Sequence, residues 1–225
     1  AAQAIRRRNV GPDYTNICVL GGVVCLAAGE LLGDDGPRGY ALARLRGFLA
    51  RLEAVGGMAE YNSPTYNLVV MESAELGLRL AREPAAVPVL DGILRRVWDG
   101  IAEHWHQPTG QWAGPHSRAY GDVIGGWVAA AIAAKTGGTI PAGTIVPAWA
   151  AGGPPCPADL RHRFHQPPPP ACLQRRASAG TATTPPVVCT TWMDAGACLG
   201  SVSCDSLWYQ CRPLIGYWRA GAAVA

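Results

Sequence analysis

Four side chains that could take part in acid–base chemistry lie close together in and just after the stretch GPHSRAYG at 114–121. They are His116, Arg118, Tyr120 and Asp122. Histidine and tyrosine can act as general base and general acid, and arginine can bind a carboxylate through two parallel hydrogen bonds. We therefore predict catalytic roles for the first three residues and a substrate-binding role for Asp122. The alternative is a loop that only caps and packs against a helix.

Two earlier stretches, GPDYTNI at 11–17 and EYNSPTY at 60–66, have the same design: a polar loop with a tyrosine close to an expected helix start. The tyrosines at 14, 66 and 120 are 52 and 54 residues apart, which suggests a repeat. The alternative is simple helix capping with an aromatic contact. Substrate-binding roles are predicted for five side chains of these two stretches: Tyr14, Asn16, Glu60, Asn62 and Tyr66.

Trp112 lies in a loop between Gly110 and Gly114. Sugar rings stack on tryptophan faces, so this residue is predicted to form a platform for a carbohydrate. Burial in a hydrophobic core is the competing interpretation, because tryptophan has a large apolar area.

Apolar periodicity predicts five helices, at 14–32, 37–55, 65–82, 86–106 and 120–135. The first, third and fifth are apolar on nearly every side, which is typical of interior helices, and the second and fourth have one apolar face. This alternation is expected of helical hairpins stacked around an axis. The polar loops would then gather at one end of the inner helices.

The rest of the chain has a different pattern. Residues 139–186 are rich in proline, as in PPCP and PPPP, and are expected to be a linker, a disordered insert or an erroneous gene model. Residues 187–225 contain two or three strand-like runs. The predicted fold is mainly α: a partial (α/α) toroid at 1–138, an irregular segment at 139–186 and a short β-rich segment at 187–225.

Composition narrows the classes of partner. The net charge of +3 is too small to indicate nucleic acid, and the apolar run at 17–29 is too short to cross a bilayer. No CxxC pair is present, so zinc bound with the usual ligand spacing is not expected. We assign no metal ligand and no cofactor. The start lacks a signal-peptide pattern and a methionine, so the chain is expected to be a fragment or a processed form. The expected partner is a polysaccharide or oligosaccharide, and the expected location is extracellular, where cysteines 198, 204 and 211 could form disulfides or stay unpaired.

The hairpin pattern, the EYNSPTY and GPHSRAYG loops and the segment LGSVSCDSLWYQCRPLIGYW together resemble the (α/α) toroid carbohydrate-active proteins, in outline the heparinase II/III-like polysaccharide lyases. The resemblance implies a toroid followed by a β-sandwich, and a β-elimination on a uronate-containing glycan. It implies that Asn62 or Arg118 neutralises the uronate carboxylate, His116 removes the C5 proton and Tyr120 protonates the leaving oxygen. An aromatic-flanked Asn–His pair of such lyases is missing here, and the toroid would be incomplete.

Two other functions stay open at this point. A glycoside hydrolase on the same fold would use a pair of carboxylates, Glu60 with Asp122 or Asp13. A non-catalytic helical scaffold or glycan-binding remnant would explain the small number of helices.

Overall fold

The computed structural model describes residues 1–205, 207–221 and 223–224. Its first half is helical, and the order of its elements is as follows: α1 (Ala2–Arg8), α2 (Thr15–Leu32), α3 (Asp35–Val55), α4 (Pro64–Leu80), α5 (Val87–His104), β1 (Trp105–His106), β2 (Gln111–Trp112) and α6 (Gly126–Thr136). Two short helices and a sheet follow: α7 (Ala148–Gly152), α8 (His162–His165), β3 (Ala171–Ser178), β4 (Val187–Met193), β5 (Ala197–Val202), β6 (Leu214–Ala220) and β7 (Ala223–Val224).

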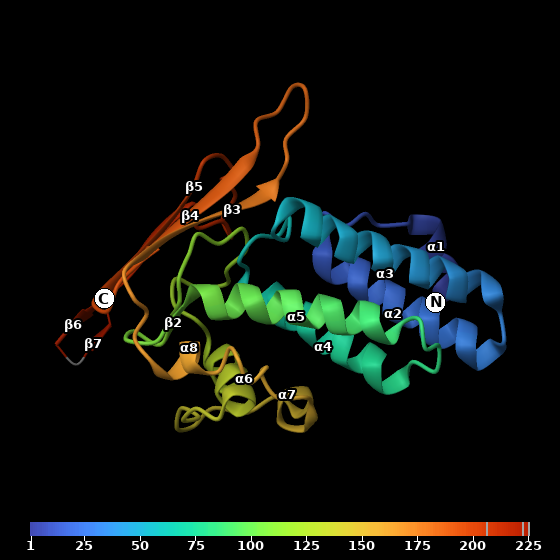
Figure 1. Ribbon diagram of the computed structural model, residues 1–225, viewed down its shortest axis with the longest axis horizontal. Coiled ribbons are helices and arrows are strands. Elements are labelled where there is room, and N and C mark those ends of the chain that lie inside the picture. The colour runs from blue at the N-terminus through green and yellow to red at the C-terminus, as the bar shows by residue number, and fades with distance from the viewer. Residues whose placement is uncertain (206, 222, 225) are drawn as a thin grey trace.

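Helices α2 to α5 form two hairpins that pack against each other, with α2 in contact with α3 and α4, and α5 in contact with α3 and α4 (Figure 1). Local signals explain their ends. The side chain of Asp34 caps α3 and that of Ser63 caps α4, while Gly33 and Gly56 end α2 and α3 in the left-handed conformation that glycine adopts without strain. The main core lies between these helices, around Leu45, Phe48 and Trp98.

Helix α2 is the one described helix that is long and apolar enough to cross a membrane by length and composition, with a mean hydropathy of 1.8. Within the protein 56% of it is buried. Core helices have the same property, so this finding does not distinguish a membrane span from a core helix.

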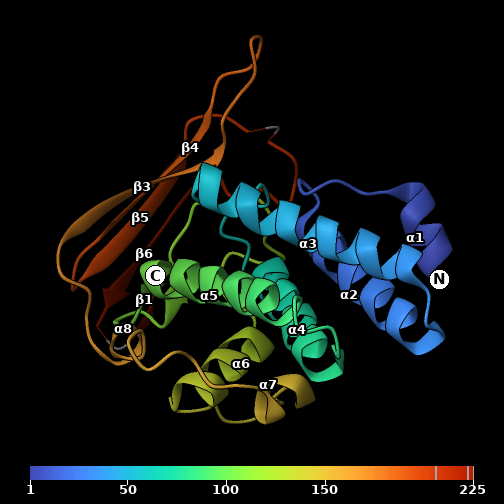
Figure 2. The same ribbon diagram turned by 45° about the vertical axis from the view of Figure 1, so that its right-hand side comes forward.

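The second layer is an antiparallel sheet in the order β3-β4-β5-β6-β7. It stands at one end of the helical hairpins, and β3 approaches the end of α3 (Figures 1 and 2). One face of the sheet, with Met193, Cys198 and Tyr217, packs on the chain around Ala113. The other face exposes Trp192, Leu199 and Trp218.

The expected mainly α, partial toroid is wrong. The protein has 46% helix and 15% strand and is a mixed α/β structure with antiparallel sheets. The sheet begins at Ala171, inside the stretch expected to be irregular, because the prolines before and after β3 obscure its short strand pattern. Helix α6 begins at Gly126 rather than at residue 120, so it is a short helix beside α7 and not a third inner helix.

Candidate functional site

The tyrosines of the three polar loops lie close together. Tyr14 directly precedes α2, Tyr66 is in the first turn of α4, and Tyr120 is in the loop that precedes α6. The hydroxyl groups of Tyr66 and Tyr120 are 2.8 Å apart, and both rings are partly or largely exposed. This hydrogen bond raises the pKa of Tyr66, so that the phenol stays protonated.

Arg118 lies among three aromatic rings. Its guanidinium carbon is 5.0 Å from the centre of the Tyr14 ring, 5.2 Å from that of Tyr66 and 4.8 Å from that of Trp208. Such distances are typical of cation–π contacts. The side chain of Arg118 is 21% exposed, so solvent and ligands can reach part of it. We call these residues, together with Glu60 and Tyr120, the Arg118 cluster.

Glu60 is a buried member of the cluster and binds both Thr15 and Arg118. One of its oxygens accepts hydrogen bonds from the Thr15 amide at 2.8 Å and from the Thr15 hydroxyl at 2.5 Å. Its other oxygen forms an ion pair with Nε of Arg118 at 3.1 Å. Glu60 is only 6% exposed, so it connects the start of α2 to the loop of Arg118 rather than facing a ligand.

Asn62 and Trp112 have structural roles. The Asn62 amide group donates to the carbonyls of Ala113 at 2.5 Å and Pro115 at 3.1 Å, and its oxygen accepts from the Trp112 indole. Trp112 is fully buried in β2, so it cannot present a face to a sugar. The predicted role of Trp112 as a platform for a sugar is therefore wrong, because the indole packs in the core beneath the loop.

His116 faces inward. It is 1% exposed, and its Nδ1 donates to the Asn62 carbonyl at 2.6 Å. Burial lowers the pKa of His116 to about 4, so the ring is neutral at neutral pH. It borders a cavity of about 160 Å³ that Tyr120, Trp127 and Tyr217 also line.

The two remaining predicted residues lie at the margins. Asp122 is largely exposed and forms an ion pair with Arg212 at 2.5 Å. Asn16 is 8% exposed, and its side-chain oxygen has no hydrogen-bond partner among the described residues. The structure thus brings Tyr14, Glu60, Tyr66, Arg118 and Tyr120 into one cluster and leaves Asn62, Trp112 and His116 beneath it.

Sequence reasoning missed Trp208, which contributes the third ring. It lies in the segment between β5 and β6, 90 residues after Arg118, in a run that had been expected to be strand. No spacing pattern links it to the three loops. The sequence signal for it is the run of large side chains LWY at 207–209. In the structure Leu207 and Tyr209 are 70% and 80% exposed, and large apolar side chains at the surface often mark binding sites.

Within the described residues, no group of three or more His, Cys, Asp and Glu side chains could hold a metal ion. All eight cysteines are free thiols, six of them buried and two exposed. The sequence had left disulfides among cysteines 198, 204 and 211 as one of two alternatives.

Comparison with known proteins gives one match. No curated protein and no solved structure matches this chain. A family model described as a domain of unknown function, DUF8769, matches residues 2–136, which include α1 to α6 and most of the Arg118 cluster. The match covers more than half of the chain, and the protein therefore belongs to the DUF8769 family of domains of unknown function.

Proposed function

We propose that the Arg118 cluster binds a uronate-containing glycan and that the protein cleaves it by β-elimination. The observation that carries this proposal is the partly exposed guanidinium of Arg118, held among the rings of Tyr14, Tyr66 and Trp208. Aromatic faces suit the apolar face of a sugar ring, and a guanidinium suits its carboxylate. An acidic sugar would use both.

In the proposed reaction, Arg118 neutralises the uronate carboxylate and thereby acidifies the proton on C5. His116 lines the same 160 Å³ cavity as Tyr120 and accepts that proton, and its low pKa keeps the imidazole neutral for this role. The electrons of the C5–H bond form a C4–C5 double bond as the C4–O bond breaks. Tyr120 gives its proton to the leaving oxygen, and Tyr66 lies within hydrogen-bond distance of it.

The test is a Tyr120→Phe variant assayed for the ultraviolet absorbance of the unsaturated product on a set of uronic polysaccharides. We expect turnover to fall by a factor of about 100 or more, since general acid catalysis contributes about that much. Tyr40→Phe is the matched control, because that hydroxyl bonds to Asn9 and Arg44, neither of which belongs to the Arg118 cluster, and the change should leave activity unchanged. Full activity in Tyr120→Phe would disprove the assignment of the acid.

A second candidate is glycan binding without catalysis, favoured by the nearly complete burial of His116. It predicts that the protein binds uronic polysaccharides, releases no unsaturated product and loses binding in Arg118→Gln. The hydrolase alternative has less support. Glu60 is occupied by Thr15 and Arg118, and Asp122 is a solvent-exposed partner of Arg212. Reducing ends released without unsaturated product would revive it.

A further inference from the structure

Helices α2 and α4 lie side by side and run in the same direction. At their starts, the rings of Tyr14 and Tyr66 meet on the same guanidinium. At their ends, the carboxylate of Glu30 on α2 accepts hydrogen bonds from the amides of Arg82 and Glu83, just beyond α4, at 2.9 Å. Helices α3 and α5 pack on one side of this parallel pair (Figure 2).

The opposite side of the pair presents exposed or half-buried side chains that recur every three or four residues. We call this surface the α2–α4 face, and its members are Ile17, Leu20, Val24, Ala27 and Leu31 of α2 and Val69, Glu72, Leu76, Arg79 and Leu80 of α4. All five members from α2 are apolar, and three of the five from α4 are apolar. Exposed apolar surface in such a continuous row is typical of an interaction site.

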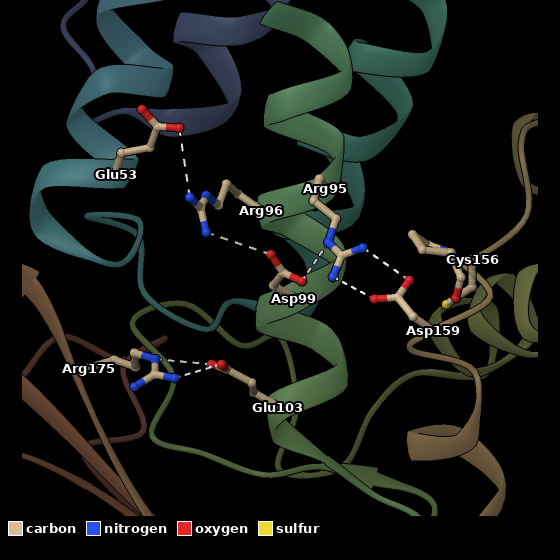
Figure 3. A network of polar contacts seen from close by, with 9 residues as sticks. Glu53, Arg95, Arg96, Asp99, Glu103, Cys156, Asp159 and Arg175 are labelled. Atoms are coloured by element: carbon tan, nitrogen blue, oxygen red, sulfur yellow. Dashed lines mark hydrogen bonds and ion pairs between the residues drawn. The ribbon is translucent and has the colours of Figure 1, made fainter. Parts of the chain in front are cut away.

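The two charged members of the face, Glu72 and Arg79, are exposed and form no ion pair with any described residue. They are seven residues apart, about 10.5 Å along the helix axis, so they cannot pair with each other. The outer side of α5 differs, because Arg95 there is paired with both Asp99 and Asp159 at 2.8 Å (Figure 3). The charges of the α2–α4 face therefore remain available to a partner.

The order of these two charges is self-complementary. A two-fold axis that crosses α4 at right angles between residues 75 and 76 would place α4 antiparallel to α4 of a second copy. Glu72 of each copy would then lie opposite Arg79 of the other, and the Leu76 side chains of the two copies would meet near the axis. Two-fold interfaces have this property, since each contact between two residues occurs twice.

The same axis matches the apolar row of α2 with itself. A Cβ at Gly77 of α4 would lie 3.0 Å from the side chain of Val23, so these two residues are at the same level along the parallel pair. The axis then crosses α2 close to residue 22. Leu20 would face Val24 of the second copy, and Ile17 would face Ala27, so apolar side chains lie opposite apolar side chains.

The face has the size of a small specific interface. Helices α2 and α4 have 18 and 17 residues, which gives a length of about 26 Å. Neighbouring helix axes lie about 8–10 Å apart, so the two helices together offer about 500 Å² per copy. Two copies would bury about 1,000 Å² in total, which is the lower limit expected of a biological interface. The expected dimer is therefore weak and exchanges with the monomer.

We propose that two copies of this protein associate through the α2–α4 face, with α4 antiparallel to α4 and Glu72 of each copy paired with Arg79 of the other. The proposal does not depend on any activity of the Arg118 cluster. Because that cluster lies where both helices begin, an antiparallel dimer would carry its two clusters at opposite ends.

Charge reversal tests the pairing directly. Glu72→Arg and Arg79→Glu would each place like charges opposite each other twice per dimer. We expect either change alone to weaken self-association by at least about tenfold. An equimolar mixture of the two variants should associate again, because a mixed dimer has opposite charges at both contacts. Arg46→Glu is the matched control, since Arg46 is an exposed residue of α3 without an ion pair in the described part of the chain.

The measurement is sedimentation equilibrium of the whole chain over about 1–100 μM, which spans the dissociation constant of a weak dimer. A reducing agent is included because Cys172 and Cys204 are exposed thiols. The mass of the wild type and of Arg46→Glu should rise from 23.6 kDa towards twice that value as concentration increases. Circular dichroism shows whether each variant is folded.

Three results would overturn the proposal. The first is a wild type that stays at 23.6 kDa over the whole range. The second is a dimer that both charge reversals leave unchanged, which would place the interface elsewhere. The third is a mixture of two folded variants that fails to associate. A monomeric wild type that sediments with phosphatidylcholine–phosphatidylglycerol vesicles, and loses this binding in Leu20→Glu, would identify a lipid surface as the partner of the face instead.

Discussion

Arg118 combines two kinds of contact that lysine cannot reproduce together. Its planar guanidinium packs against aromatic faces, and its in-plane donors pair with Glu60 at 3.1 Å. The rings restrict the side chain while part of it stays exposed. A ligand carboxylate would thus meet an arginine that has already lost much of its freedom, which lowers the entropic cost of binding.

We expect Arg118→Lys to weaken binding of uronic polysaccharides by about tenfold or more, because the variant keeps the charge but loses the stacked fork of donors. Affinity electrophoresis or calorimetry would measure it. Arg46→Lys, at an exposed position of α3, is the control. If both variants bind as the wild type does, charge alone explains recognition and the planar geometry has no role.

His116 makes the stability of the folded protein depend on pH. Its folded-state pKa of about 4 lies below the ordinary value of 6.5. Between these values the unfolded chain takes up a proton that the folded protein refuses, so the free energy of unfolding decreases as pH falls from about 7 to about 4. The loss attributable to this residue is about 3 kcal/mol, from about 1.4 kcal/mol per unit of pKa.

Urea denaturation across this pH range would measure the effect in the wild type and in His116→Asn. In the variant, the free energy of unfolding should fall less steeply as pH decreases. The contributions of His104 and His106 should remain, because burial lowers their pKa values too. Parallel pH profiles for the two proteins would contradict the assigned pKa.

At the scale of elements, contact between β5 and the loop of His116 is very close. A Cβ at Gly200 would overlap the carbonyl group of Gly114, and that same carbonyl accepts a hydrogen bond from Thr191 on β4 at 2.6 Å. Glycine at position 200 therefore lets the loop lie directly on the sheet.

Gly200→Ala should lower the free energy of unfolding by about 1–3 kcal/mol, the usual cost of overpacking, and should weaken glycan binding by displacing the loop. Chemical denaturation and a binding assay would measure the two effects. Gly39→Ala on α3, where a Cβ meets no atom within 4 Å, should instead be neutral or stabilising by up to about 1 kcal/mol. An unchanged Gly200→Ala protein would show that the loop can move away without loss.

Much of the helical layer was predictable, and much of the site was not. The helix expected at 14–32 is α2 at Thr15–Leu32, because its apolar sequence and the glycine that ends it are local signals. The Ser63 cap and Pro64 locate the start of α4 in the same way. Helix α1 was not predicted. The start of α6 was placed six residues too early. Long-range bonds hold that stretch away from a helix, including the Tyr217 hydroxyl to the Asp122 carbonyl at 2.6 Å. The burial of Trp112 and the position of Trp208 beside Arg118 also depend on tertiary contacts. The spacing of residues in the sequence does not reveal such contacts.

For the whole molecule, the helical layer and the sheet depend on each other. The backbone of His116 exchanges two hydrogen bonds with Arg212, at 3.1 and 2.8 Å, and Ala119 donates to Gln210 at 2.8 Å. Lys135, at the end of α6, is buried against Glu75 at 2.7 Å and also donates to the Pro154 carbonyl at 3.1 Å. Residues 2–136, the extent of the family match, thus lack several partners of their own buried groups.

A fragment of residues 1–136 should therefore melt at a lower temperature and less cooperatively than the whole chain, and should bind a dye specific for exposed apolar surface. The fragment keeps the Lys135–Glu75 pair but loses the Pro154 carbonyl, and leaving a buried donor without its acceptor costs about 1–3 kcal/mol. Circular dichroism and dye fluorescence would test this. If the fragment melts sharply at the temperature of the whole chain, the sheet adds nothing to the stability of the helices.

The position of Trp208 in the Arg118 cluster has a consequence for synthesis. The cluster takes its rings from residues 14, 66, 120 and 208, so its last member leaves the ribosome long after the helices. A nascent chain that already contains the whole helical layer would present Arg118 with one ring missing and with its loop unsupported by the sheet. Competence to bind a ligand would then arise late and abruptly, when the segment carrying Trp208 folds back onto helices made earlier.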